Sequence, residues 1–431
     1  MSLHIMQILP IPHPLSATIR LPGSKSLTNR ALLIAALANR RTHLRNALFS
    51  DDSCYFAGAL QTLGFDIQLN EQSREMTIIG LGGRIPARKA ELFIGNAGTA
   101  ARFLSALLTL GHGEYTLDGD SRMRERPIGD LVEALTQLGC DVTPALQSVG
   151  GQVCPPLKIV ADGLRGGKTR VAGDTSSQFL SALLMIAPYA KNPVEISLST
   201  KLNSKPYVDM TLAVMKDFGV EVECRGYECF TVRPSSFISP SSYEIESDAS
   251  AASYFFAAPA ICGGTVKVEN ISRNSKQGDV AFLDVLAKMG CTIAEADNSL
   301  AVTQASELHG IDVDMRDIPD TAQTLAVIAP FATGPTHIRG IASARLKETD
   351  RIHAIYTELT RIGVRVEEHQ DGMTIYPCKK FIPAVFHTYN DHRMAMAFSL
   401  IGLRVPGIVI ENPSCVSKTF PDYFEILDSL C

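Results

Sequence analysis

The sequence is poor in the features that mark several common classes of protein. Its 431 residues include ten cysteines, but no two form a CxxC pair and none stands with histidine at a metal-ligand spacing. This pattern indicates no zinc site and predicts reduced, mostly buried thiols, as in the cytoplasm. There is no low-complexity segment and no run of like charges. The formal net charge of −5 argues against a basic face for nucleic acid.

Long hydrophobic runs are scarce as well. Two stretches, Ala249 to Val266 and Thr321 to Ile338, run 18 residues without a charge. Both are interrupted by proline and glycine, which favours a core helix followed by a strand over a membrane span. The N-terminal segment lacks a basic lead and a long apolar core, so we expect no signal peptide. No GxxxxGK[ST], HExxH or strand-linked GxGxxG occurs, which argues against a nucleotide loop, a dinucleotide fold or a metalloprotease site.

Six apolar, helix-like runs recur along the chain, each opened by a short polar stretch. The openings lie 71 to 78 residues apart. In a second, interleaved series, an amphipathic run ends at a glycine and a strand-like stretch follows. Such regular spacing predicts a six-fold repeat of one α/β unit. The openings are Ser24, Asn96, Asp174, Asp248, Asp320 and Asp391, and the glycines are Gly64, Gly139, Gly219, Gly290 and Gly363.

The repeat predicts an α/β fold of two domains, each made of three units. In each unit one helix is apolar nearly all round and should be buried, whereas the second helix is apolar on one side. The sixth unit stops after its second helix, where earlier units continue into a strand, and the first 22 residues contain strand-like pieces. We therefore expect the N-terminal segment to complete the last unit. The first domain is then residues 23–246, and the second is residues 1–22 with 247–431.

Basic residues stand at helix starts, where the backbone N–H groups and the helix dipole are already positive. A capping serine, threonine, aspartate or asparagine is ordinary there, but a cation costs stability unless an anion lies beside it. We expect the helix N-termini to point to a cleft between the domains, where roughly eight cations bind two small phosphate or carboxylate anions without a cofactor. The basic residues are Lys25, Arg30, Arg124, Arg126, Lys205, Arg345, Lys347, Arg351, Arg393 and Lys418.

Two carboxylates, Asp320 and Glu348, are acid–base candidates, because each opens a predicted helix beside basic groups. An ordinary helix cap is the alternative for both. Lys347 and Arg351 would share one face of a helix, so KETDR also fits a solvent-exposed ladder of ion pairs. Capping is likewise the simplest interpretation of the other aspartates that open helices: Asp174, Asp248 and Asp391.

Eight motifs follow one another along nearly the whole chain: PGSKSLTNRAL, LFIGNAGTAARFL, RMRERPIGDL, TSSQFLSALL, SKPYVDMTL, RLKETDRIHA, YNDHRMAMAFSL and KTFPDYFEIL. Together they closely resemble the EPSP synthase (3-phosphoshikimate 1-carboxyvinyltransferase) family, whose two domains of three βαβαββ units agree with the repeat count. The resemblance implies cofactor-free transfer of the enolpyruvyl group of phosphoenolpyruvate to the 5-hydroxyl of shikimate 3-phosphate. It implies addition–elimination through a tetrahedral intermediate, release of phosphate, and a place in aromatic amino acid biosynthesis. We expect a cytoplasmic monomer with no nucleic-acid or membrane partner.

The resemblance also implies a role for each site residue. Lys25 contacts both substrates, Asp320 is the base for the attacking hydroxyl, and Glu348 exchanges a proton with the methylene carbon. The residues implied to bind shikimate 3-phosphate are Lys25, Ser26, Arg30, Ser176, Ser177, Gln178, Ser204, Tyr207, Asp320, Ser343 and Lys347, with Lys205 nearby. Those implied to bind phosphoenolpyruvate are Lys25, Gly98, Arg126, Gln178, Arg351, Arg393 and Lys418, with His392 adjacent, and no metal is implied.

Two positions depart from the common pattern of that family. Ser343 stands where many members have asparagine, so its hydroxyl has a shorter reach toward the substrate. Phe103 stands where many have proline. We expect this difference to shift the helix that carries Gly98, so the sequence does not decide whether the inhibitor glyphosate is effective.

Two other functions stay open. One is the sister transferase that acts on UDP-N-acetylglucosamine, although its loop usually carries a cysteine and GDSRMRERP has none. The other is a non-catalytic repeat scaffold that binds a phosphorylated partner.

Overall fold

The computed structural model describes residues 4–146, 151–304 and 307–430. The chain divides into two compact units. Unit 1 consists of Met1–Pro22 and Glu246–Cys431, and unit 2 consists of Gly23–Ile245. Residues 1 and 431, the expected outer ends of the second domain, lie outside the described residues.

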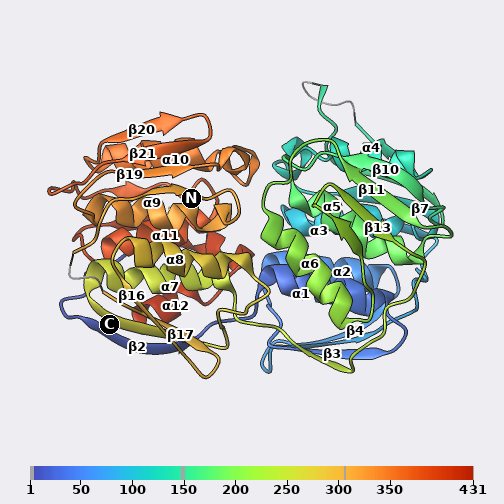
Figure 1. Cartoon of the computed structure of the whole chain (residues 1–431), viewed down its shortest axis with the longest axis horizontal. Coiled ribbons are helices and arrows are strands. Elements are labelled where there is room, and N and C mark those ends of the chain that lie inside the picture. The colour runs from blue at the N-terminus through green and yellow to red at the C-terminus, as the bar shows by residue number, and fades with distance from the viewer. Residues whose placement is uncertain (1–3, 147–150, 305–306, 431) are drawn as a thin grey trace. The chain divides into compact units, whose positions relative to one another are not determined.

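The sheets of both units repeat one topology. Each four-stranded sheet has one parallel pair of neighbouring strands and two antiparallel pairs. The α/β repeat that the sequence predicts is therefore confirmed (Figure 1). Unit 2 has the strand orders β14-β3-β5-β4, β6-β7-β9-β8 and β10-β11-β13-β12, and unit 1 has β16-β17-β15-β2, β18-β19-β21-β20 and the three-stranded β1-β23-β22.

The strands are short, as expected of a sheet built from repeated units. Those of unit 2 are β3 (Arg41–Arg45), β4 (Asp66–Asn70), β5 (Glu75–Ile79), β6 (Lys89–Phe93), β7 (His112–Asp118), β8 (Asp141–Pro144), β9 (Leu157–Asp162), β10 (Gly167–Val171), β11 (Val194–Leu198), β12 (Glu223–Arg225), β13 (Cys229–Val232) and β14 (Ser242–Glu244). Those of unit 1 are β1 (Ile5–Gln7), β2 (Leu15–Arg20), β15 (Gly264–Glu269), β16 (Thr292–Ala296), β17 (Ser299–Thr303), β18 (Asp312–Asp314), β19 (Thr336–Arg339), β20 (Val366–His369), β21 (Gly372–Ile375), β22 (Val385–Phe386) and β23 (Val409–Glu411).

The N-terminal segment contributes to two sheets rather than one. β1 pairs with β23 in the sheet of the sixth repeat, as expected of a segment that completes the last unit. β2 instead pairs in parallel with β15 of the fourth repeat, so the prediction is wrong for this strand. The reason is an exchange of strands: β2 precedes the first helix of unit 2, whereas β14, which precedes the first helix of the fourth repeat, pairs with β3 in unit 2.

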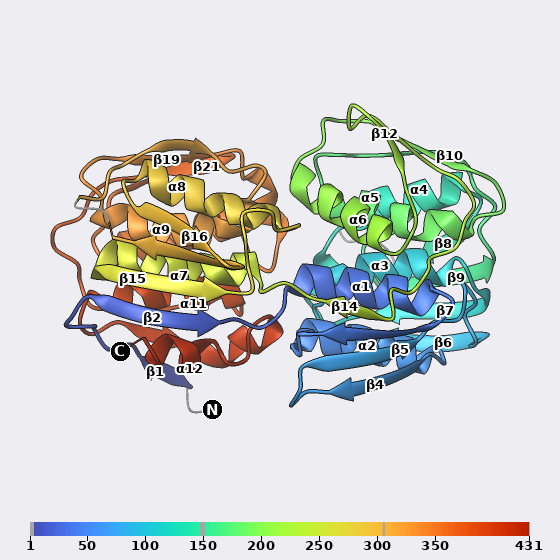
Figure 2. The same ribbon diagram turned by 60° about the horizontal axis from the view of Figure 1, so that its bottom comes forward.

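The first helix of each repeat is almost wholly buried, as the sequence predicts. All 14 residues of α7 (Ala249–Cys262) and all 11 of α3 (Gly98–Leu108) are buried. Within each unit these helices pack together, and the sheets lie around them (Figures 1 and 2). The other first helices are α1 (Lys25–Leu37), α5 (Ser177–Ile186), α9 (Ala322–Ile328) and α11 (His392–Gly402). The second helices are α2 (Asp51–Thr62), α4 (Gly129–Gln137), α6 (Lys205–Asp217), α8 (Phe282–Lys288), α10 (Arg351–Arg361) and α12 (Tyr423–Asp428).

The structure bears on two further features of the sequence, its apolar stretches and its cysteines. Across the described ranges, no helix is long and apolar enough to cross a bilayer. Three of the nine described cysteines are buried, so the expectation of mostly buried thiols is wrong. Cys54 and Cys224 are exposed, because they lie on a second helix and on a short edge strand rather than on the buried first helices.

Candidate active site

The first group of predicted site residues in unit 2 lies at the start of α1. Ser24 caps this helix, and its side chain accepts a hydrogen bond from the backbone N–H of Leu27 at 3.4 Å. Lys25 Nζ lies 3.2 Å from Asp52 Oδ2, and the Asp52 side chain is buried. Asp52 belongs to α2, so its carboxylate holds Lys25 against the helix N-terminus despite the unfavourable dipole.

Arg30, on the same helix, is buried with neutral oxygen atoms around it. Its Nε donates to Thr211 Oγ1 at 2.7 Å, and the two terminal nitrogens donate to the Ser26 and Tyr207 carbonyls and to Ser181 Oγ. Burial lowers the pKa of Arg30 to about 10, because the low-dielectric interior disfavours its charge. The guanidinium carbon also lies 5.4 Å from the ring centre of Phe103.

The second group in unit 2 surrounds the start of α3. Arg126 donates from one terminal nitrogen to the Asn96 carbonyl at 3.1 Å and to Asn96 Oδ1 at 2.9 Å. A Cβ added at Gly98 would lie 2.5 Å from the other terminal nitrogen of Arg126. A side chain at Gly98 would therefore displace this guanidinium, which gives the glycine a definite local function. Figure 1 labels α3, which begins at Gly98.

The third group in unit 2 lies on α5 and α6. Ser176 caps α5 and accepts from the backbone N–H of Gln178, whose side chain donates to Thr99 Oγ1 at 3.3 Å and so joins α5 to α3. Ser204 has a left-handed backbone with φ 56° immediately before α6. The ammonium group of Lys205 lies 5.1 Å from the ring centre of Tyr227.

In unit 1, Arg351 is the centre of a cluster of opposite charges. It donates to both oxygens of Asp391 at 2.8 and 3.2 Å, to Glu348 at 2.8 Å and to Asp320 at 3.3 Å. Burial alone would lower the pKa of Arg351, but the three carboxylates, Asp391 first, outweigh it and raise that pKa above its ordinary value.

Asp320 is held from two sides in this cluster. Arg393 donates to its carboxylate at 2.7 Å and to its backbone carbonyl at 3.2 Å, and Arg351 approaches the other carboxylate oxygen. Lys418 Nζ lies 4.0 Å from Glu348. Three cations and three carboxylates thus balance one another. This pairing offsets part of the free energy that it costs to bury each charge.

The remaining predicted residues of unit 1 stand around this cluster. His392 is buried, with its Nδ1 3.7 Å from Asp391. Ser343 and Lys347 are half-buried in and just after the short 3-10 helix Ala342–Leu346. Across the described ranges, no group of three or more histidine, cysteine, aspartate or glutamate side chains is arranged to hold a metal ion.

Comparison with known proteins decides the family. The family model for EPSP synthase (3-phosphoshikimate 1-carboxyvinyltransferase) matches residues 9–427. The chain belongs to the EPSP synthase family. The 3-phosphoshikimate 1-carboxyvinyltransferase of Nostoc punctiforme is 49% identical over 419 residues, covering 97% of each chain. The enzyme of that name from Shewanella denitrificans is 52% identical over 408 residues, covering 94% of each.

Solved structures agree on the fold of this EPSP synthase family member. An EPSP synthase from Acinetobacter baumannii superposes with a TM-score of 0.82 at 24% identity, covering 99% of this chain and 98% of that one. The enolpyruvyl transferase NikO from Streptomyces tendae reaches a TM-score of 0.80 at 16% identity, covering 99% of this chain and 98% of its own. At these identities the likeness shows the fold alone.

Several helix boundaries differ from those that the sequence predicts. α5 is capped by Ser176 rather than Asp174. KETDR is not a helical ladder: Asp350 caps α10, and Lys347 precedes the helix in a non-helical conformation. Glu348, which was expected to open a helix, also precedes α10, and its carboxylate accepts a hydrogen bond from Arg351.

Several residues that were not predicted as site residues contact the predicted ones and hold them in place. Asp391, interpreted as a cap, does cap α11 by accepting from the Arg393 N–H at 2.9 Å, but it also binds Arg351. Its position two residues before Arg393 in NDHRM was the sequence feature that could have indicated a role in the site. Asp52, Ser181 and Thr211 carried no comparable signal, because their partners are remote in sequence.

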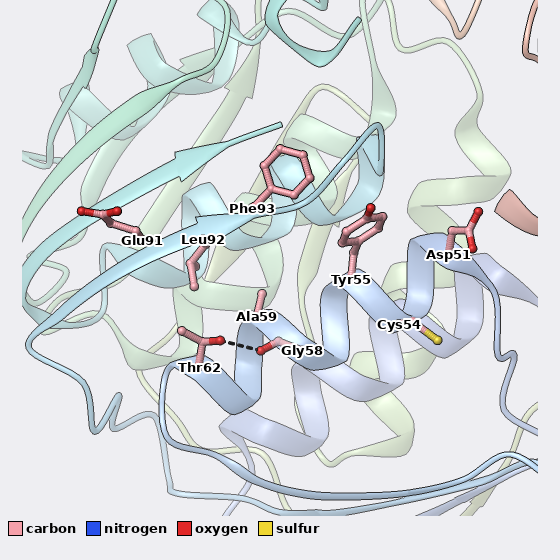
Figure 3. Close-up of a pocket in the computed structure, with 9 residues that line it drawn as sticks. All are labelled: Asp51, Cys54, Tyr55, Gly58, Ala59, Thr62, Glu91, Leu92 and Phe93. Atoms are coloured by element: carbon pink, nitrogen blue, oxygen red, sulfur yellow. Dashed lines mark hydrogen bonds between the residues drawn. The ribbon is translucent and has the colours of Figure 1, made fainter. Parts of the chain in front are cut away.

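A separate hollow lies on the surface of unit 2 and contains none of the predicted site residues. It has a volume of about 440 Å³ and lies between α2 and β6 (Figure 3). The rings of Tyr55 and Phe93, which help to line it, meet edge to face with 6.0 Å between their centres. A Cβ added at Gly95 would lie 2.7 Å from the Tyr55 ring, so this tyrosine supports the turn that leads to Asn96. Its nine lining residues are Asp51, Cys54, Tyr55, Gly58, Ala59, Thr62, Glu91, Leu92 and Phe93.

Proposed function

We propose that this chain transfers the enolpyruvyl group of phosphoenolpyruvate to the 5-hydroxyl of shikimate 3-phosphate and releases phosphate. Membership in the EPSP synthase family supports this, as do curated relatives at about half identity over nearly the whole chain. The observation that carries the mechanism is the position of Asp320 between Arg351 and Arg393. Two guanidinium groups stabilise the carboxylate form of Asp320, which is the form that a general base needs.

The proposed reaction is an addition followed by an elimination. In the addition, the 5-hydroxyl oxygen bonds to C2 of phosphoenolpyruvate, its proton passes to Asp320, and the methylene carbon takes a proton from Glu348. In the elimination, the resulting methyl group returns its proton to Glu348, Asp320 passes its proton to the departing phosphate as the C2–O bond breaks, and the double bond is restored. Cationic groups favour this sequence because they stabilise the departing phosphate and the developing charge. No cofactor enters the scheme.

The substrate-binding roles are carried over as part of the same proposal. In unit 2, Arg126 and Gly98 serve phosphoenolpyruvate, and Arg30 serves the carboxylate of shikimate 3-phosphate. Lys25 contacts both substrates. The 3-phosphate is assigned to Ser176 and Ser177 with Lys205 nearby, and the rest of that substrate to Ser26, Gln178, Ser204, Tyr207, Ser343 and Lys347. Arg351, Arg393 and Lys418 are assigned to phosphoenolpyruvate, with His392 adjacent.

A phosphate-release assay tests the proposal. The purified chain is given phosphoenolpyruvate with shikimate 3-phosphate, with UDP-N-acetylglucosamine, or alone. We expect phosphate release only with shikimate 3-phosphate. Release with the nucleotide sugar would assign the sister activity, and binding without release in every mixture would favour a scaffold.

Calorimetry tests the assignment of Lys25. We expect Lys25→Met to weaken the binding of shikimate 3-phosphate and also of phosphoenolpyruvate added after it, because one ammonium group serves both. A defect confined to one substrate would contradict the shared contact.

We also propose a cytoplasmic monomer, and sedimentation velocity checks the oligomeric state.

A further inference from the structure

The surroundings of Arg30 are unusual for a buried cation. Its side chain is only 2% exposed, and no carboxylate pairs with it among the described residues. Buried charges are ordinarily paired, because an isolated charge loses most of its hydration. Neutral oxygens and the ring of Phe103 supply only part of that compensation. The positive charge of Arg30 is therefore largely available to a ligand.

The hydrogen bonds of Arg30 leave one donor. A guanidinium carries five N–H groups, one on Nε and two on each terminal nitrogen. Nε donates to Thr211 at 2.7 Å, and one terminal nitrogen donates to Ser181 at 3.3 Å and to the Tyr207 carbonyl at 3.2 Å. The other terminal nitrogen donates to the Ser26 carbonyl at 3.0 Å. One N–H of this last nitrogen remains.

Thr211 links the partners of Arg30 to one another. It lies on α6, is fully buried, and accepts the shortest of the Arg30 hydrogen bonds. Its own hydroxyl hydrogen lies within reach of Ser181 Oγ at 2.8 Å and of the Tyr207 carbonyl at 2.9 Å. The hydroxyl can accept from Arg30 and donate to one of these oxygens at the same time. Its position therefore fixes the Nε end of the guanidinium and, with it, the direction of the remaining N–H.

We infer that Thr211, supported by Ser181, is a positioning residue that makes Arg30 present a single N–H to the carboxylate of the substrate. The inference rests on the proposed function, because it names the anion that Arg30 serves. A single N–H gives a one-point contact with the carboxylate, in place of the two-point fork that a free guanidinium forms. The second carboxylate oxygen is then left to another donor.

The test is the isosteric change Thr211→Val, compared with Thr211→Ser. Valine keeps the volume and removes the acceptor, so we expect the dissociation constant of shikimate 3-phosphate, measured by calorimetry, to rise about ten-fold. Serine keeps the oxygen, so we expect affinity within about two-fold of the original. The KM for phosphoenolpyruvate and kcat at saturation should change by less than about two-fold, because neither depends on Arg30 once the first substrate is bound.

Thr169→Val is the matched control. Thr169 is buried in the same unit and its hydroxyl donates to the Ala134 carbonyl at 2.8 Å, but it does not contact Arg30. We expect unchanged affinity for shikimate 3-phosphate in this variant. Equal weakening in Thr169→Val and Thr211→Val would overturn the inference, and so would full affinity in Thr211→Val or failure of serine to restore binding.

A second pair of variants covers a failure of Thr211→Val to fold. Ser181→Ala removes one of the two acceptors of the terminal nitrogen that also donates to the Tyr207 carbonyl, and it should weaken the binding of shikimate 3-phosphate about three-fold. Ser105→Ala, on the neighbouring α3, removes a buried hydroxyl that donates to the Ala101 carbonyl at 2.7 Å and should leave that affinity unchanged. Equal affinities in the two variants would overturn the inference. An unaltered protein that releases no phosphate from the substrate pair would instead show that the proposed function has failed.

Discussion

The two units treat a buried arginine in opposite ways. Arg30 in unit 2 and Arg351 in unit 1 are each 2% exposed. The partners of Arg30 are hydroxyl and carbonyl oxygens, whereas those of Arg351 are three carboxylates. Accordingly, burial lowers the pKa of Arg30 to about 10. Burial acts on Arg351 in the same direction, but the carboxylates outweigh it and raise the pKa of Arg351.

This contrast separates two uses of the same side chain. A guanidinium among neutral oxygens keeps its charge available to a ligand, at a cost in stability before the ligand binds. A guanidinium among carboxylates is neutralised within the protein and orients those carboxylates instead. In the proposed reaction, Arg30 is therefore a binding group, and Arg351 also holds Asp320 and Glu348 in place for proton transfer.

The largest expected effect comes from Asp320, the carboxylate between two arginines of unit 1. We expect Asp320→Ala to lower kcat about 10²- to 10⁴-fold, because removal of the hydroxyl proton loses its base. Binding of shikimate 3-phosphate should stay measurable, since the groups of unit 2 still hold it. Phosphate release measures the first quantity and calorimetry the second. Turnover close to that of the original protein would refute the role of Asp320.

The two arginines themselves provide the sharpest test of the contrast. We expect Arg351→Met to lower the free energy of unfolding by about 3–5 kcal/mol, because three carboxylates lose their shared partner. Arg30→Met should change it by less than about 1.5 kcal/mol, since a buried charge without a carboxylate disappears along with its hydrogen bonds. Guanidinium-chloride unfolding of both variants gives the comparison. Equal losses would show that neutral oxygens compensate Arg30 as fully as carboxylates compensate Arg351.

A smaller effect is expected at Gly98, where unit 2 keeps Arg126 in place. Gly98→Ala puts a Cβ 2.5 Å from a terminal nitrogen of Arg126, so the flexible guanidinium has to move. We expect the KM for phosphoenolpyruvate to rise about ten-fold or more, with little change in the affinity for shikimate 3-phosphate.

Gly58→Ala is the control for the change at Gly98. A Cβ at Gly58 meets nothing within 4 Å on helix α2. We expect this change to leave both kinetic constants alone and to stabilise the fold by about 0.5–1 kcal/mol. An unchanged KM in Gly98→Ala would show that Arg126 does not set the affinity for phosphoenolpyruvate.

The smallest effects concern two buried tyrosines of unit 1 whose rings meet edge to face, 5.7 Å apart. The Tyr423 hydroxyl donates to the Met396 carbonyl at 2.9 Å and lies 2.8 Å from Ser399 Oγ, whereas the Tyr254 hydroxyl lies near the Arg393 guanidinium without a well-formed hydrogen bond among the described residues. We expect Tyr423→Phe to destabilise the fold by about 1 kcal/mol and Tyr254→Phe to leave it unchanged or more stable. Thermal melting measures both, and a larger loss in Tyr254→Phe would reveal a partner for its hydroxyl.

Local patterns predicted much of the fold and part of the site. The spacing of the polar openings and glycines predicted the six α/β repeats, and the all-round apolar runs predicted the buried first helices such as α7. The basic residues at helix starts singled out Lys25, Arg126 and Arg393. Periodicity reports burial, and capping reports helix ends, so both can be inferred from neighbouring residues.

The precise helix starts were harder to predict. Asp174 and Ser176 are both good caps, and only the structure selects Ser176. The KETDR segment has ideal spacing for ion pairs on a helix, yet α10 begins at Arg351. Arg351 turns inward to three carboxylates there, whereas the exposed pairs of a surface ladder would contribute little to stability.

The amino-acid sequence by itself determined the repeat, the burial of the first helices, the family and the kinds of charged group available, because each depends on neighbours along the chain. Tertiary structure alone decided which partner each charge receives. Asp391 rather than solvent binds Arg351, 40 residues away, and Thr211 binds Arg30 across 181 residues. A hydrogen bond depends on distances of about 3 Å in space, and no local pattern specifies those distances between remote residues.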